Sequence, residues 1–151
     1  MLAKDIMSKR VITVFSDTSV EELAGILTGN NISGAPVVDK EGHVIGIVTE
    51  KDIMYKNAEP KLPPVADLLG AHIYLGGIKK YNEQLKKILA KNVGELMTKE
   101  VVTVDEDTDI RQIAEIMLTN NINRVPVLDK SRKLRGIIGR TDIVRAISRT
   151  L

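Results

Sequence analysis

Residues 3–58 repeat at residues 93–148 with a constant offset of 90 and no gap, and this repeat constrains the fold more than any other feature of the chain. Twenty of the 56 aligned positions are identical. Two copies are too few for a solenoid, in which each unit stacks on the next. We therefore expect a face-to-face pair of units related by a pseudo-two-fold axis.

Each copy has the pattern of a β-α-β-β-α unit. In the first copy we expect strands at 11–14, 35–38 and 43–48, and helices from Thr18 to about 29 and from 50 to 57. Thr18 and Glu21 have the spacing of a capping box at a helix start. The second copy repeats the pattern at 101–104, 110–120, 125–128, 134–138 and 141–149.

Neither copy is large enough to fold comfortably by itself, since a domain of about 60 residues buries only about 60% of its surface. The predicted fold class is therefore α+β, with two repeats packed through their sheets and a helical connection between them. We place the first repeat at 1–58, the connection at 59–92 and the second repeat at 93–151.

The connection begins with three of the five prolines, which exclude a helix there. A helix is expected from Ile78 to Asn92, with one apolar stripe made by Ile78, Tyr81, Leu85 and Ile88. This stripe needs a partner. Packing within the chain or a homodimer is the first interpretation, a partner protein the second, and a membrane surface the third.

Composition excludes several classes of function. The chain has no cysteine, so it has neither disulfides nor thiolate metal sites, and no apolar stretch approaches 18 residues. A net charge of +2 and few aromatic residues disfavour nucleic-acid binding. His43 and His72 accompany no nucleophile–base set, so we expect neither an enzyme nor a metal site. Because no long apolar stretch is present, we also expect no membrane association. A cytoplasmic location fits this composition.

The stretch from Gly46 to Asp52, G-I-V-T-E-K-D, joins an apolar strand pattern to a helical one, and it returns as Gly136 to Asp142, G-I-I-G-R-T-D. A helix start carries unpaired amide donors that favour phosphate. Thr49 could add a hydroxyl donor, and Asp52 could accept from the hydroxyls of a ribose. The alternative is an ordinary capping pair, which stabilises a helix by about 1 kcal/mol.

Three motifs occur in both copies: I-M-S-K-R-V-I-T-V, N-N-I-S-G-A-P-V-V-D and G-I-V-T-E-K-D-I in the first, and L-M-T-K-E-V-V-T-V, N-N-I-N-R-V-P-V-L-D and G-I-I-G-R-T-D-I in the second. Together they resemble a tandem pair of CBS (cystathionine β-synthase) domains, also called a Bateman module. The resemblance covers the chain except for the connection at 59–92.

This resemblance implies a regulatory module that binds adenosine-containing ligands, such as AMP, ADP, ATP or S-adenosylmethionine, in clefts between the repeats. In such modules the hydroxyl of the Gly-apolar-apolar-Ser/Thr-x-x-Asp run meets phosphate and the carboxylate meets ribose. The positions implied in the first repeat are Thr13, Val14, Ser33, Gly34, Ala35, Pro36, Thr49 and Asp52. Those in the second are Thr103, Val104, Asn123, Arg124, Val125, Pro126, Arg140, Thr141 and Asp142.

The second repeat departs from this pattern at Gly139, where Ser or Thr is usual. Thr141 or Arg140 is the substitute for the missing hydroxyl, and Arg124 is either a phosphate ligand or a solvated surface residue. The two clefts are therefore expected to be unequal, and the pattern favours the cleft with Thr49 and Asp52 over the cleft with Asp142.

The function expected from the sequence is a stand-alone sensor of adenosine nucleotides, and thus of cellular energy, with no catalytic cofactor. It would signal through a homodimer formed by its helices or through a regulated partner protein. The alternative is an interaction module that keeps the CBS fold without a ligand.

Overall fold

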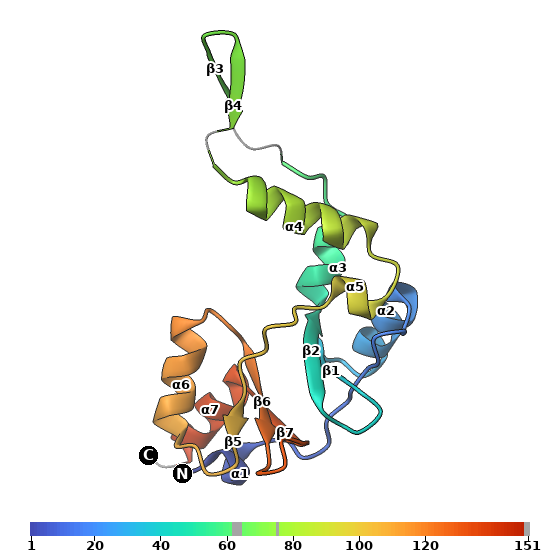
Figure 1. Cartoon of the computed structure of the whole chain (residues 1–151). Helices are drawn as coiled ribbons and strands as arrows, with labels where there is room; N and C mark the ends of the chain where they lie inside the picture. Colours follow the sequence, from blue (N-terminus) through green and yellow to red (C-terminus); the bar gives the residue numbers. More distant parts are fainter. Residues whose placement is uncertain (62–64, 75, 150–151) are drawn as a thin grey trace. The chain divides into compact units, whose positions relative to one another are not determined.

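The computed structural model describes residues 1–61, 65–74 and 76–149, which form two compact units (Figure 1). Unit 1 contains Met1–Thr13, Pro36–Ile47 and the chain from Lys99 onward, and unit 2 contains Val14–Ala35 and Val48–Thr98. The units therefore differ from the sequence repeats, because each is assembled from segments of both copies.

The elements are those of an α+β protein with small sheets, as predicted. In chain order they are α1 (Ala3–Ile6), α2 (Val20–Gly29), β1 (Gly34–Val38), β2 (Val44–Thr49), α3 (Glu50–Lys56), β3 (Val65–Leu68), β4 (Ala71–Tyr74), α4 (Ile78–Leu89), α5 (Val93–Leu96), β5 (Val104–Asp105), α6 (Ile110–Thr119), β6 (Arg124–Leu128), β7 (Leu134–Gly139) and α7 (Arg140–Ser148). Strands β1 and β2 pair with each other, as do β3 and β4, while β5 lies parallel to β6 and β6 antiparallel to β7.

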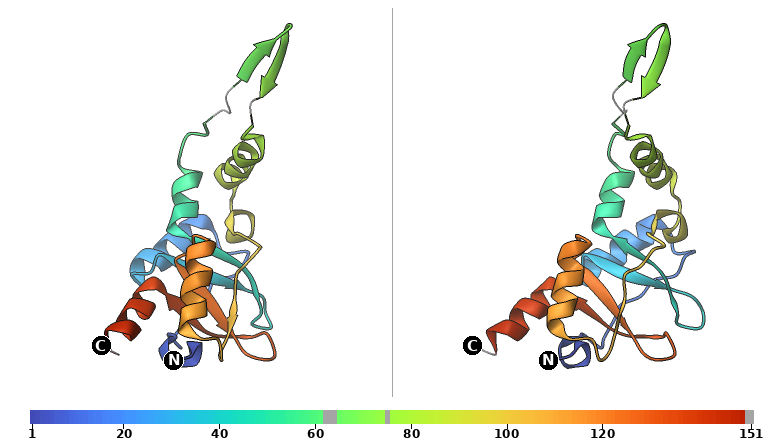
Figure 2. Two further views of the ribbon diagram at one scale, coloured as in Figure 1. Left: turned by 90° about the vertical axis from the view of Figure 1, so that its left-hand side faces the viewer. Right: turned by 60° about the vertical axis from the view of Figure 1, so that its left-hand side comes forward.

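The segment that begins each repeat is exchanged. In unit 1 the amide of Ala3 donates to the carbonyl of Thr108 at 2.8 Å, and in unit 2 the amide of Val93 donates to the carbonyl of Thr18, also at 2.8 Å. These bonds are related by the offset of 90 residues. Accordingly α1 lies against the elements of the second repeat (Figure 2), and α5 packs on α2 of the first.

The core of unit 1 includes the exchanged segment. Its buried residues are Ala3, Val104, Ile113, Met117, Val125, Val127, Ile138 and Ile143. Met7 reaches β7, where its side chain lies against the backbone of Gly136. Ser8 and Ile137 exchange amide-to-carbonyl bonds of 2.9 and 3.0 Å, which fix α1 on this strand.

Both repeats end their first helix in the same way. Asn31 and Asn121 have φ values of 53° and 51°, which place both in the left-handed region that asparagine tolerates better than most residues. This geometry explains why the dipeptide Asn-Asn recurs at both places, because it turns the chain from the helix into the following strand.

Three sequence predictions differ from the structure. Residues 11–14 form no regular strand, and the equivalent strand of the second copy is only the two-residue β5. The cap of α2 is Ser19, whose hydroxyl accepts from the amide of Glu22 at 3.1 Å. Thr18 instead accepts from the amide of Phe15.

The connection contains a feature that the sequence reading missed, the hairpin of β3 and β4. Its register pairs Val65 with Tyr74 and Leu68 with Ala71. The turn at Leu69 and Gly70 has φ values of 51° and 83°, as a two-residue hairpin turn requires. The predicted helix from Ile78 is present as α4 but ends at Leu89. Of the extended proline stretch, 62–64 lie outside the described residues.

Across the described ranges, no helix combines the length and the apolar character needed to cross a bilayer.

Candidate functional site

The corner of the first repeat is built where β2 meets α3. Asp52 accepts from the backbone amide of Thr49 at 2.9 Å and from the Thr49 hydroxyl at 3.4 Å, both at Oδ2. Asp52 is 7% exposed, and within the described ranges it is the one charged residue in the buried class. The predicted pair of hydroxyl and carboxylate is therefore present and adjacent.

The other oxygen of Asp52 is bound by a residue from the connection. The Nζ of Lys87, in the last turn of α4, donates to Oδ1 of Asp52 and also to the carbonyl of Leu96 at 3.3 Å. Helix α4 is attached to α3 a second time, because Lys56 donates to the carbonyls of Ile88 and Ala90 at 3.0 and 2.6 Å. Both views of Figure 2 place α4 beside the end of α3.

The corner of the second repeat has the same backbone geometry and a different environment. Asp142 accepts from the amide of Gly139 at 2.8 Å through Oδ2, and Arg145 from the same helix donates to Oδ1 at 3.5 Å. The Asp142 side chain is 23% exposed, compared with 10% for Asp52. It lines a cavity of about 420 Å³ in unit 1, together with Met1, Asp5, Ile6, Arg145, Ala146 and Arg149.

In both repeats the strand segment that precedes the proline is tied to the corner. The amide of Glu50 donates to the carbonyl of Ser33 at 2.9 Å, and the amide of Arg140 donates to the carbonyl of Asn123 at 3.1 Å. Ser33, Asn123, Arg140 and Thr141 are exposed. The backbone of Ser33 therefore lies at the first corner and that of Asn123 at the second.

The apolar members of the predicted sets are mostly core residues. Val14, Gly34, Ala35, Pro36, Val104, Val125 and Pro126 are buried, and Thr13, Thr103 and Arg124 are half-buried. Val104 and Val125 belong to the core of unit 1. A base that binds along these strands would therefore meet mainly their backbone groups.

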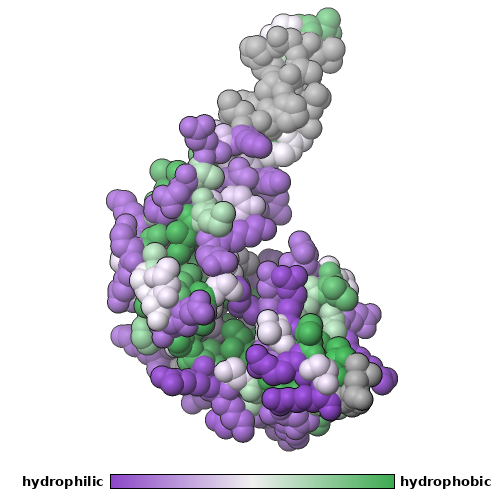
Figure 3. Space-filling model, turned by 180° about the vertical axis from the view of Figure 1, so that it is seen from behind, coloured by the Kyte–Doolittle hydropathy of each residue, from purple (hydrophilic) through white to green (hydrophobic). Residues whose placement is uncertain are grey.

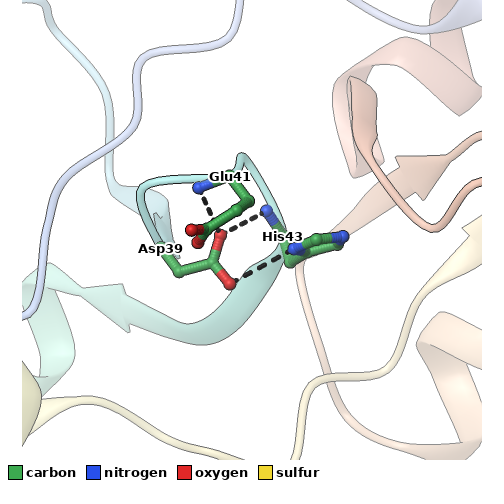
Figure 4. A group of neighbouring side chains, drawn as sticks. All are labelled: Asp39, Glu41 and His43. Carbon is green, nitrogen blue, oxygen red and sulfur yellow. Dashed lines mark hydrogen bonds and ion pairs between the residues drawn. The ribbon is translucent and has the colours of Figure 1, made fainter.

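The turn between β1 and β2 holds a group that sequence reading did not single out (Figure 4). Asp39 accepts from the backbone amide of His43 at 2.8 Å and pairs with the His43 ring at 3.2 Å, and the carboxylate of Glu41 lies nearby. The hydrogen bond from the His43 amide, with the ring contact, lowers the pKa of Asp39. These hydrogen bonds hold the turn between β1 and β2 together, and they explain why the three side chains lie close to one another.

Two grooves match residue for residue across the repeats. The first, of about 720 Å³ between α2 and α3, is lined by Ala24, Leu27, Thr28, Asn31, Ile32, Ser33, Glu50, Ile53 and Met54. The nine residues at an offset of 90 line a groove of about 220 Å³ between α6 and α7. Figure 3 shows hydrophobic surface on the face that carries α6 and α7, where Leu118 and Val144 are 81% and 66% exposed.

The sequence profile of the CBS domain matches residues 3–59 and 93–149. The chain belongs to the CBS-domain family. It is a tandem CBS pair, and the solved structures most similar to it include other CBS pairs. CBS pairs are in general regulatory modules rather than catalytic ones.

Among relatives, the protein MJ1426 of Methanocaldococcus jannaschii is 34% identical over 97% of this chain and 91% of its own length. Inosine-5'-monophosphate dehydrogenase of the same organism is 32% identical over 95% of this chain, but over only 23% of the enzyme.

Two of the similar solved structures contain adenosine compounds. CBSX2 of Arabidopsis thaliana in complex with AMP has a TM-score of 0.76 and 25% identity, over 99% of this CBS pair and 97% of that chain. The CBS domain pair of MJ0100 in complex with 5'-methylthioadenosine and S-adenosyl-L-methionine has a TM-score of 0.73 and 31% identity, over 100% and 98% of the two chains.

Lys87 is the residue at the corner that sequence reasoning missed. Four lysines of α4 lie mostly off its apolar stripe, and this placement predicts solvated side chains. They are Lys79, Lys80, Lys86 and Lys87. No sequence signal pairs it with Asp52, which lies 35 positions earlier.

Proposed function

We propose that this CBS pair is a regulatory module that binds adenosine-containing ligands at the carboxylate corners of its two repeats. The observation that carries the proposal is that Asp52 and Asp142, at matching positions, both accept from a backbone amide at the start of a helix. Each carboxylate is thus oriented as an acceptor for the two hydroxyls of a ribose. The adenosine compounds in the similar CBSX2 and MJ0100 structures support the same ligand class.

The corner with Asp142 is the more accessible of the two. Its carboxylate borders a cavity of about 420 Å³ that also contains Arg145 and Arg149, which could pair with phosphate. The sequence pattern favoured the corner with Thr49 and Asp52, but there the carboxylate is paired with Lys87. We therefore propose that the first ligand binds at Asp142, although Gly139 supplies no hydroxyl.

We also propose that two copies of the chain associate through the helices α6 and α7. A groove of about 870 Å³ lies between them, lined by Ile110, Leu118, Ile143 and Ile147 among others. Leu118 and Ile147 are 81% and 53% exposed. Adjacent large apolar side chains exposed to this degree favour a protein contact. An isologous contact with a second copy would bury the same apolar surface on both copies.

The proposal is tested by calorimetric titration of the full chain with AMP and, separately, with S-adenosylmethionine. We expect binding in the wild type, and at least a tenfold loss of affinity in Asp142→Ala. Asp105→Ala is a matched control, because Asp105 is an exposed aspartate of the same unit that lies outside both corners. The proposal fails if neither compound binds to any of the three proteins, which are the wild type, Asp142→Ala and Asp52→Ala.

A ligand-free interaction module is the second candidate function, and the exposed apolar surface of α6 and α7 favours it. In that case the chain would self-associate without binding either compound. Light scattering of the protein with and without ligand separates the two candidates, because only a sensor changes its assembly or its stability when the ligand is added.

A further inference from the structure

We propose that Lys87 is a gate on the first corner: its ammonium group competes with the ribose of an adenosine ligand for Asp52, so binding there must release helix α4. This inference rests on the proposed function of Asp52 as a ribose acceptor. It adds a competing group within the chain and identifies α4 as the element that responds to the ligand.

Both carboxylate oxygens of Asp52 already accept hydrogen bonds. Oδ2 accepts from the amide and the hydroxyl of Thr49, and Oδ1 accepts from Lys87. The side chains of Asp52 and Lys87 are 10% and 21% exposed. A ribose diol needs an accessible carboxylate oxygen and room beside it. The ammonium group of Lys87 occupies the space beside Oδ1 of Asp52. Binding therefore requires the ammonium group to leave.

Helix α4 is attached in a way that allows this movement. It lies against α3, and its apolar residues Tyr81, Leu85 and Ile88 are half-buried, but none of its residues from Ile78 to Leu89 is fully buried. Its last turn is held largely by two lysines, because Lys56 of α3 binds the carbonyls of Ile88 and Ala90 while Lys87 binds Asp52. An element with few buried contacts opens at a lower free energy than the core does.

Among the residues that the structure describes, none from another helix makes a corresponding ion pair with the carboxylate of the second corner. Asp142 is contacted at 3.5 Å by Arg145 of its own helix, one turn away, and its side chain is 23% exposed. An ion pair at this spacing on an exposed helix contributes little and dissociates readily. The two corners therefore share backbone geometry but differ in access, and the difference lies in Lys87.

The gate couples ligand binding at the first corner to the position of helix α4. A ligand that binds only when Lys87 has left Asp52 favours the released state of α4 by its differential affinity for the two states. Helix α4 would then report the state of the first corner, while the second corner binds its ligand without moving α4.

The test uses Asp142→Ala as the background, so that only the first corner can bind. In this background we compare Lys87→Met, which keeps the apolar stem and removes the charge, with Lys86→Met, a matched change at the neighbouring exposed lysine. Calorimetry with AMP and with S-adenosylmethionine should show at least tenfold tighter binding in Lys87→Met, equivalent to about 1.4 kcal/mol. Lys86→Met should leave the affinity unchanged.

A second measurement does not depend on Lys87→Met folding. Addition of AMP at saturating concentration to the Asp142→Ala protein should speed hydrogen exchange at the amides of the last two turns of α4. A lysine with a purely structural role predicts slower or unchanged exchange when a ligand binds nearby.

Two results would overturn the gate. Weaker binding in Lys87→Met would mean that Lys87 holds the ligand phosphate, and equal binding would mean that it does not compete. The gate alone has failed if the wild type binds AMP through Asp142 while Lys87→Met in the Asp142→Ala background binds no better than that background. If neither compound binds to any of these proteins, the proposed function has failed as well.

Discussion

Replacement of Gly136 by alanine tests the exchanged packing of α1 on β7. A Cβ atom at Gly136 would lie 2.4 Å from Sδ, 2.7 Å from Cγ and 3.0 Å from Cβ of Met7. Because three atoms of the side chain are too close, rotation of the terminal methyl group alone does not relieve the clash. Met7 must leave its position or the strand must shift.

Overpacking of this kind costs about 1 to 3 kcal/mol. For a chain of this length each kcal/mol lowers the melting temperature by about 2 to 4 °C, so we expect a decrease of roughly 2 to 12 °C. Urea unfolding of Gly136→Ala should show a lower midpoint with an unchanged slope. Gly25→Ala is the matched control, because a Cβ atom at Gly25 meets nothing within 4 Å and alanine favours the helix.

A double mutant completes the test. If Met7 is the clashing partner, Met7→Ala should relieve most of the effect of Gly136→Ala, with a coupling energy of at least about 0.5 kcal/mol. The reasoning is refuted if Gly136→Ala unfolds at the wild-type midpoint, or if the two changes simply add.

Three further predictions concern the second corner, the β1–β2 turn and the α6–α7 surface. Gly139→Thr should tighten AMP binding about 3- to 10-fold and leave adenosine binding unchanged in titration calorimetry, because a Cβ there has no neighbour closer than 3.5 Å and one added hydroxyl bond is worth about 0.5 to 1.5 kcal/mol. The lowered pKa of Asp39 means that its contribution to stability is present above the unfolded pKa of about 3.9 and is lost as pH falls through the folded value; Asp39→Asn should therefore flatten the acid limb of a plot of melting temperature against pH. Leu118→Glu and Val144→Glu should each convert a dimer to a monomer in light scattering, because each places a charge on the exposed apolar surface.

Each of these has a result that contradicts it. Equal gains for AMP and adenosine in Gly139→Thr would remove phosphate from the explanation. An unchanged acid limb in Asp39→Asn would mean that the turn does not distinguish the folded from the unfolded state. If the glutamate variants keep the wild-type mass, the contact between copies lies elsewhere.

The features predicted correctly from sequence depend on residues close together in the chain. Thr49 and Asp52 are three positions apart, so a strand followed by a helix suffices to bring them together. The choice of Thr18 as a helix cap was wrong because Ser19 and Glu22 have the same spacing as Thr18 and Glu21, and the pattern does not distinguish them.

Contacts between residues far apart in the chain could not be predicted from the sequence, and the reason is physical. The two copies carry nearly the same apolar pattern, so Met7 and Met97 fit either repeat equally well on hydrophobicity. Their exchange follows from the path of the chain in three dimensions. The contact between Lys87 and Asp52 is of the same kind, since a lysine among other lysines gives no sign of its partner.

The exchange of initial segments has a consequence for folding during synthesis. Unit 2 lacks its α5 until the ribosome has passed residue 96, and α1 cannot reach its packing partners until β7 and α7 have been made. Contacts between such distant parts of the chain form slowly, because a long loop must close before they stabilise anything. The first repeat alone should therefore emerge with an exposed apolar face, and this chain should depend on chaperones until the second repeat has been made.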